Sequence, residues 1–208
     1  ANISEATQYL VNELFGRFGL VVLNPDEAAF KQAIIPVLKD DLLHQTAYSI
    51  VSAEIEKLAA HYSAQAHPRP INLFYLKDNL RERIEKRGDA WHVINSDIKW
   101  QESELMAELE AHPERFSPNV ILRGVFQESI LPDVAFIGGG AEVAYWLELK
   151  AIFEHYHVFY PVILLRQSVL WINDTQAKLR KQLGLSISEI FKPELVLIRN
   201  FISNNTGD

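Results

Sequence analysis

The 208-residue sequence contains no cysteine, so neither a disulfide framework nor a thiolate metal site is available to it. No apolar run approaches the roughly 20 residues that a membrane-spanning helix needs. The first residues do not form the pattern of a secretory signal peptide. These absences predict a soluble cytoplasmic protein without disulfides.

Sequence motifs that indicate a particular cofactor, metal or catalytic mechanism are also missing. The sequence lacks the GxGxxG dinucleotide fingerprint, and no Gly-Lys-Ser/Thr follows its glycine run as a P-loop requires. His155 and His157 lie two residues apart, which points them to different sides of a helix, and the other histidines show no ligand spacing. Chain order alone assigns no Ser-His-Asp triad. We therefore expect no metal, and catalytic residues are not identified by motif.

The charge balance is acidic, with 27 Asp and Glu residues against 20 Lys and Arg residues and a net charge of −7. Nucleic-acid surfaces need clustered basic residues, so this balance argues against a nucleic-acid partner. It leaves room for a small anionic ligand held by one or two arginines. A chain of this length forms one medium domain, or one domain with an insertion.

Residues 116–167 show the clearest pattern in the chain. Ser117 and Pro118 have the character of a helix N-cap and a first helical residue, and Pro132 ends that helix. A buried strand at 134–137, three glycines, a helix at 141–156 and a second buried strand at 161–165 follow. This order predicts a βαβ unit with parallel strands and a right-handed crossover.

The remaining sequence supplies more helices and a small β region. Apolar spacing predicts helices at 3–15, 27–38, 40–62, 102–111, 176–183 and 193–202. Strands are predicted at 18–23 and 71–76, and residues 81–94 form either a hairpin or a charged helix. The fold class is therefore α/β, a Rossmann-like partial parallel sheet with helices and an inserted small β element. We predict three parts: 1–39, 40–112 and 113–208.

The glycine run Gly138, Gly139 and Gly140 is the first candidate ligand site. Glycines between a strand and a helix let backbone N–H groups approach a ligand, and a helix N-terminus favours negative charge. Glu142 in the first turn would repel a phosphate there, which suits an amine or a hydroxyl better. The alternatives are a tight turn without a ligand and a glutamate that faces water.

A second candidate is the face formed by Asn119, Arg123 and Gln127 at i, i+4 and i+8, with Glu128 beside it. Arginine offers a planar fork of donors that could grip a carboxylate or a phosphate, although the spacing alone favours a solvated helix face. Gly124 costs this helix about 1 kcal/mol relative to alanine, which indicates close approach of another backbone.

Four further positions concern the strand end and the aromatic residues. Arg166 and Ser168 follow the 161–165 strand, at the edge where ligands of open α/β sheets gather. Tyr145 and Trp146 fit the core better than a base-stacking role. Physical reasoning from the residues thus ends at an α/β domain with a small-ligand edge.

The stretch PERFSPNVILRGVFQESILPDVAFIGGGAEVAYWLELK resembles the signature region of the bacillithiol biosynthesis cysteine-adding enzymes, the BshC family. FGLVVLNPD, INLFYL with RERI after it, and PVILLRQS match that family in pattern and order. Two departures are present: the family commonly has proline where this chain has Gly124, and Gly-Pro-Gly-Glu where this chain has Gly139 to Glu142.

The resemblance implies a Rossmann-type core similar to that of class I aminoacyl-tRNA synthetases, interrupted by connecting-peptide insertions. It implies condensation of cysteine with glucosaminyl malate, and ATP is expected as the activating cofactor. A coiled-coil arm and a homodimer are expected of the full-length protein. On matching positions the resemblance places all the candidate residues named above from the helix, the glycine run and the strand end.

The family's members are much longer than this chain, and their first Rossmann half carries an early glycine- and glutamine-rich nucleotide motif. We therefore expect this chain to be an internal fragment with half of the active-site cleft, and to be inactive alone. The competing hypothesis is a non-catalytic α/β module for ligand binding or interaction. Upstream strand–glycine–helix sequence in the full reading frame would favour the enzyme.

Overall fold

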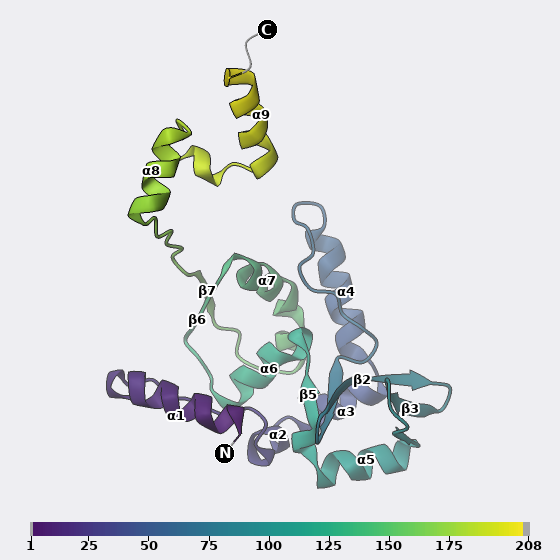
Figure 1. The fold of residues 1–208 in the computed structure, drawn as a ribbon. Helices are drawn as coiled ribbons and strands as arrows, with labels where there is room; N and C mark the ends of the chain where they lie inside the picture. The colour runs from purple at the N-terminus through teal and green to yellow at the C-terminus, as the bar shows by residue number, and fades with distance from the viewer. Residues whose placement is uncertain (1, 206–208) are drawn as a thin grey trace. The chain divides into compact units, whose positions relative to one another are not determined.

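The structure is a computed structural model and describes residues 2–205. It divides into a first unit that ends at Arg166 and a second unit that starts at Gln167, each with its own elements (Figure 1). The family-like stretch, from Pro113 to Lys150, lies wholly in the first unit.

Seven α-helices are described in the first unit. They are α1 (Ile3–Phe15), α2 (Ala28–Gln32), α3 (Ile35–Leu43), α4 (Thr46–Leu58), α5 (Glu102–Ala111), α6 (Val120–Ile130) and α7 (Gly140–His155). The predicted helices at 3–15 and 102–111 are confirmed. The predicted 40–62 helix is interrupted, because Gln45 adopts a left-handed backbone conformation with φ 57° that ends α3 and starts α4.

The first unit contains an antiparallel sheet of five strands. The strands are β1 (Leu73–Lys77), β2 (Leu80–Arg87), β3 (Ala90–Val93), β4 (Lys99–Trp100) and β5 (Phe116–Pro118), in the order β4-β3-β2-β1-β5. The hairpin is confirmed over the charged-helix alternative. Arg87 pairs with Ala90, and Gly88 between them has φ 61°, which a residue without Cβ adopts freely.

A separate pair of strands, β6 (Ala135–Gly138) and β7 (Val162–Leu165), is parallel, with Ala135 opposite Val162 and Gly138 opposite Leu165. Helix α7 connects them, which confirms the predicted βαβ unit. Phe136 of β6 stacks on Trp146 of α7, with ring centroids 4.2 Å apart. The fold is therefore a Rossmann-like α/β domain in which an antiparallel sheet accompanies a small parallel pair.

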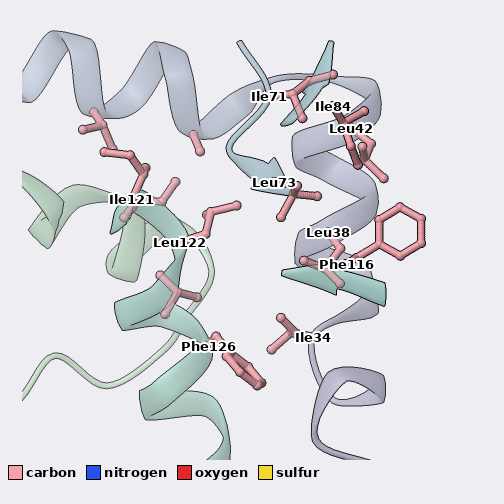
Figure 2. Close-up of a cluster of buried hydrophobic side chains, with 14 of the residues drawn as sticks. Ile34, Leu38, Leu42, Ile71, Leu73, Ile84, Phe116, Ile121, Leu122 and Phe126 are labelled. Atoms are coloured by element: carbon pink, nitrogen blue, oxygen red, sulfur yellow. The ribbon is translucent and has the colours of Figure 1, made fainter. Parts of the chain in front are cut away.

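The hydrophobic core of the first unit joins its helices to the antiparallel sheet. Figure 2 shows Leu38 and Leu42 of α3 beside Leu73 of β1 and Phe116 of β5, with Leu122 of α6 on the other side. All five side chains are buried. Residues from distant parts of the sequence thus form one continuous core, which fixes α6 and its neighbour α7 against the sheet.

A buried polar junction adds specific contacts to this core. Asp41 of α3 accepts hydrogen bonds from the backbone N–H of Asn72 at 2.6 Å and from its side-chain amide at 3.1 Å. Asn72 in turn accepts one from the Asn119 side chain at 3.1 Å. Burial raises the pKa of Asp41 to about 7, although both hydrogen bonds favour its charged form.

Two sequence predictions are wrong in detail. Residues 18–23 form no strand: Phe18 belongs to a 3-10 turn, and Val21 is exposed. An apolar run becomes a strand only beside a partner, and none pairs with this one among residues 2–205. Ser117 and Pro118 belong to β5 and pair with β1, so the N-cap of α6 is Asn119, whose side chain accepts from the Ile121 N–H at 2.8 Å.

The second unit contains α8 (Asp174–Gln182), a 3-10 turn (Glu189–Phe191) and α9 (Glu194–Asn205). The Asn173 side chain caps α8 by accepting from the Gln176 N–H at 2.9 Å. The apolar side chains of the second unit, such as Phe191 and Leu195, are largely exposed. Neither unit, within residues 2–205, has a helix long and apolar enough to cross a membrane.

Candidate functional site

The glycine run forms the junction between β6 and α7. Gly138 ends the strand, Gly139 is the N-cap of the helix, and Gly140 is its first residue. The Gly139 N–H donates to the Glu142 carboxylate at 2.7 Å, and the Gly139 carbonyl accepts from the Val143 N–H at 2.9 Å. Glu142 thus occupies the donor at the helix N-terminus, where its charge complements the helix dipole.

Two of the three glycines have a steric reason to lack a side chain. A Cβ on Gly138 would lie 2.7 Å from the Phe136 ring, which is too close to accommodate. A Cβ on Gly139 would lie 3.1 Å from a guanidinium nitrogen of Arg166, whereas one on Gly140 would meet nothing within 4 Å. Gly138 is therefore required for packing, and Gly139 lets the Arg166 guanidinium lie directly against the backbone.

Arg166 is fixed at this turn by its backbone as well. Its N–H donates to the Gly138 carbonyl at 2.8 Å, which extends the β6–β7 pairing by one residue. The side chain is exposed, and no carboxylate among residues 2–205 forms an ion pair with it. A guanidinium thus remains free to bind at the carboxyl ends of two parallel strands, where ligands of α/β sheets bind.

Three polar residues gather around the first turns of α7. Burial raises the pKa of Tyr145; the charge of Glu142 raises it further, and the charge of Arg123 on α6 opposes the shift. The Tyr145 hydroxyl therefore lies within electrostatic reach of both charged groups.

A groove of about 400 Å³ opens beside the glycine turn. Its walls are Ile55 and Leu58 of α4, Val143 and Leu147 of α7, and the loop at 62–65. Gly140 and Leu165 also line it, which places the groove at the carboxyl edge of the β6–β7 pair. A mostly apolar hollow with a few polar groups in its walls, here Ser63, Gln65 and Glu148, is a common form of small-ligand site.

Glu148 holds one wall of this groove in place. Its side chain is buried, and its two carboxylate oxygens accept from the backbone N–H groups of Gln65 at 2.7 Å and Ala66 at 3.1 Å. Sequence reasoning missed Glu148. The available signal was a charged residue between Leu147 and Leu149 on a helix whose other inward positions are apolar.

Several predicted site residues form hydrogen bonds within the fold. The Gln127 amide donates to Glu128 at 3.1 Å and to Asp133 at 3.3 Å. Glu128 is buried and accepts from the Asp133 N–H at 2.8 Å, so it fixes the turn between α6 and β6. Burial raises the pKa of Glu128, and the charge of Asp133 adds to the shift while the hydrogen bonds oppose it.

Trp146 and Asn119 are likewise structural. Trp146 is 2% exposed and packs on Phe136 and Phe153, which leaves its indole no open surface for a ligand. Asn119 caps α6 and bonds Asn72. Gly124 does mark a close approach, but of aromatic side chains and not of another backbone: a Cβ there would lie 3.1 Å from the Phe153 ring.

The remaining predicted residues divide between the two units. Gly139, Gly140, Glu142, Tyr145 and Arg166 lie at the start of α7 or directly beside it. Ser168 belongs to the second unit, so its position relative to the glycine turn is not defined. The first unit thus carries a compact candidate site of backbone N–H groups, one free guanidinium, one carboxylate and an apolar groove.

The sequence was compared with models of known protein families. The family model described as "Bacillithiol biosynthesis BshC, N-terminal Rossmann-like domain" matches residues 1–167. The chain belongs to the BshC family. This family is the one that the stretch from Pro113 to Lys150 resembles, and the match covers the β6–α7–β7 unit and the candidate site.

Curated relatives in this family carry the name "Putative cysteine ligase BshC". The chain is 47% identical to the relative from Flavobacterium johnsoniae over 95% of this chain and 37% of that protein. It is 39% identical to the relative from Cytophaga hutchinsonii, over 98% and 39%, and 33% identical to that from Bacillus pumilus, over 88% and 35%. The chain therefore spans well under half the length of these BshC relatives.

Proposed function

We propose that the chain is part of a cysteine ligase that joins cysteine to glucosaminyl malate, with its substrate site at the β6–α7 turn. The observation that carries the proposal is the Arg166 guanidinium lying over Gly139 at the carboxyl ends of β6 and β7. Membership of the BshC family and the relatives' name support the ligase class.

The charges at the turn match the two substrates. Malate brings carboxylates, which a free guanidinium binds through paired N–H donors. Both substrates carry an amine, and the Glu142 carboxylate at 2.7 Å from the Gly139 nitrogen can accept from an ammonium as well. Arg166 would hold the malate group, and Glu142 would orient an amine beside the groove.

The condensation forms a C–N bond between a carboxyl carbon and an amine nitrogen with loss of the elements of water, so the carboxyl must be activated. The turn itself does not fit a triphosphate, because Glu142 already accepts from Gly139 and adds negative charge there. None of the residues of this turn is therefore assigned to ATP. The resemblance still leads us to expect ATP as a cofactor of the complete ligase.

The wider organisation is part of the same proposal. Residues 1–39 and 113–208 would belong to the Rossmann-like core, with 40–112 as an insertion. The complete protein would be a cytoplasmic homodimer joined by a coiled coil. The 208-residue chain alone would bind substrate without forming product, because condensation needs both reactants held in register.

The test is an NMR titration of the 208-residue chain with glucosaminyl malate and, separately, with cysteine. We expect shifts at Gly139–Glu142 and Arg166, and weaker glucosaminyl malate binding by about tenfold in Arg166→Ala. Glu142→Gln keeps an acceptor for the helix cap but removes the charge, and should weaken cysteine binding.

The matched control is Arg17→Ala, which removes an exposed arginine near α1. It should leave both titrations unchanged. Shifts confined to other parts of the chain, or equal loss of binding in Arg17→Ala and Arg166→Ala, would refute the assignment of the turn and favour the module without ligase chemistry.

A further inference from the structure

A second hollow, separate from the glycine turn, lies where the α3–α4 junction, the loop before β1 and strand β2 meet. Its volume is about 210 Å³, and it shares no residue with the groove beside α7. Ile71 and Ile84, both buried, form an apolar floor. The polar residues around it are Gln45, Arg69, Arg83, Glu85 and Lys86. We name this hollow the basic pocket.

The basic pocket concentrates positive charge in an acidic protein. Three cationic side chains and one carboxylate line it, although the chain as a whole has a net charge of −7. The carboxylate of Glu85 already pairs with Arg87, outside the pocket, at 3.2 Å. Within residues 2–205, neither Arg69 nor Arg83 forms a salt bridge. Their charges are therefore unmatched by the protein.

The backbone of Arg69 and the strand that carries Arg83 are anchored in the fold. The Arg69 backbone N–H donates to the Asn72 side chain at 3.1 Å, and the Arg69 backbone carbonyl accepts from that side chain at 2.8 Å. Asn72 is fully buried and fixed by Asp41. Arg83 lies on β2, which pairs with β1 on one side and β3 on the other.

Lys86 is also restrained. Its ammonium lies 4.3 Å from the centroid of the Trp91 ring, and Trp91 is fully buried with its indole N–H bonded to the Leu42 carbonyl at 3.0 Å. A cation over an aromatic face is held in place by the ring quadrupole. The backbone around the pocket and the Lys86 ammonium are thus in place before any ligand arrives, which lowers the cost of binding.

We propose that the basic pocket binds a small oxyanion, either a phosphate or a short carboxylate. Guanidinium groups match both geometries through two parallel N–H donors. The volume is below the roughly 300–1,000 Å³ of drug-sized ligand pockets, so the ligand is small. The proposal is independent of the substrate site at the β6–α7 turn.

The experiment is an NMR titration of the 208-residue chain with inorganic phosphate and, in a second arm, with succinate. Sodium chloride keeps the ionic strength constant, so that general screening does not mimic binding. We expect saturable shifts at Arg69–Asn72 and Arg83–Lys86. Arg83→Gln and Arg69→Gln should each weaken binding by about tenfold. Response to phosphate alone would identify a phosphate site, and response to both a general oxyanion site.

Arg81→Gln is the matched control, because Arg81 is on the same strand, stacks over Phe74 at 4.0 Å and does not line the pocket. It should bind as the unmodified chain does. Thermal melts of all three variants show whether folding is retained, and Arg69, being exposed, should be substituted without loss of stability. Absence of saturable shifts in both arms, or an equal loss in Arg81→Gln, would overturn the proposal.

Discussion

The antiparallel sheet and the parallel pair of the first unit bury their apolar side chains to different extents. Leu73 of β1 is 1% exposed, whereas Leu164 of β7 is 46% exposed and Ile137 of β6 is 64% exposed. On the parallel pair only one face is covered, where Phe136 packs on Trp146. The antiparallel sheet is stabilised by a closed core, and the parallel pair by one helix.

This difference places the residues proposed to bind substrate outside the closed core. Parallel strands are normally covered on both faces, so we expect the open face of β6–β7 to be a contact surface in the complete protein. The Arg166 guanidinium, which forms no ion pair among residues 2–205, lies at the less buried β6–β7 pair. In the sheet region Asp41, Asn72 and Asn119 bond one another within the fold, whereas Arg69 and Arg83 of the basic pocket form no salt bridge among residues 2–205.

The largest expected effect is a difference in the free energy of unfolding between leucine-to-alanine substitutions in the two regions. Leu73→Ala should lower the free energy of unfolding by about 2–5 kcal/mol, because it leaves a cavity in a closed core. Leu164→Ala should cost less than about 1 kcal/mol, because solvent already reaches that side chain. Urea denaturation of both variants measures the comparison, and equal losses would contradict it.

The second effect is a pH dependence located in the sheet region. The pKa of Asp41 in the folded protein is about 7, above its usual 3.8, so the protonated form is favoured by folding. The stabilisation is complete below pH 3.8 and is lost as the pH rises through 7. Each pH unit within that window costs at most about 1.4 kcal/mol.

Urea midpoints at pH 5 and pH 8 measure this dependence. Asp41→Asn should flatten the profile between these values, while Asp97→Asn, at an exposed position, should leave it as it is. A profile that rises with pH and survives Asp41→Asn would show that Asp41 is charged throughout.

A third effect concerns the loop that forms the groove wall. Glu148→Ala removes the acceptor of the Gln65 and Ala66 N–H groups, and should cost about 1–3 kcal/mol because the Ala66 group is buried. Hydrogen exchange at residues 63–66 should accelerate while exchange in β1 and β2 is unchanged. Uniform acceleration across the first unit would indicate global destabilisation instead.

The smallest expected effect is on association. Exposed apolar faces promote contact between molecules, so the 208-residue chain should self-associate, and Ile137→Lys should reduce this without unfolding it. Light scattering measures the change, with Lys77→Arg as a conservative control on β1. Scattering that is unaffected by Ile137→Lys would exclude the open face as the contact surface.

Local pattern predicted the βαβ unit and the glycine turn correctly, because each depends on neighbouring residues, and it left the hairpin open against a charged helix. It failed where distant partners decide. The 18–23 run lacks a partner strand, and Ser117 and Pro118 form a strand because β1 lies beside them. No spacing rule shows that Glu148 reaches the backbone at Gln65 and Ala66, or that Asn72 bonds both Asp41 and Asn119.

The sequence also predicted which candidate residues lie near one another. Gly139, Glu142 and Arg166 meet because a strand end, a turn and a helix start are adjacent in any βαβ unit. In the i, i+4, i+8 row Asn119 and Gln127 form hydrogen bonds within the fold while Arg123 stays exposed, and ligand binding by these residues stays a prediction. Family resemblance supplied the reaction, which no residue pattern here specifies.

The proposed substrate role of the β6–α7 turn is tested most directly by steady-state kinetics of the proposed condensation in the complete protein, with Arg166→Ala and Glu142→Ala set against Arg17→Ala. Loss of one charge-assisted contact costs roughly 1.5–3 kcal/mol, so kcat/KM should fall about tenfold to more than a hundredfold with a much smaller change in stability. Near-unchanged kcat/KM in both variants would contradict the account and return these residues to the solvated surface.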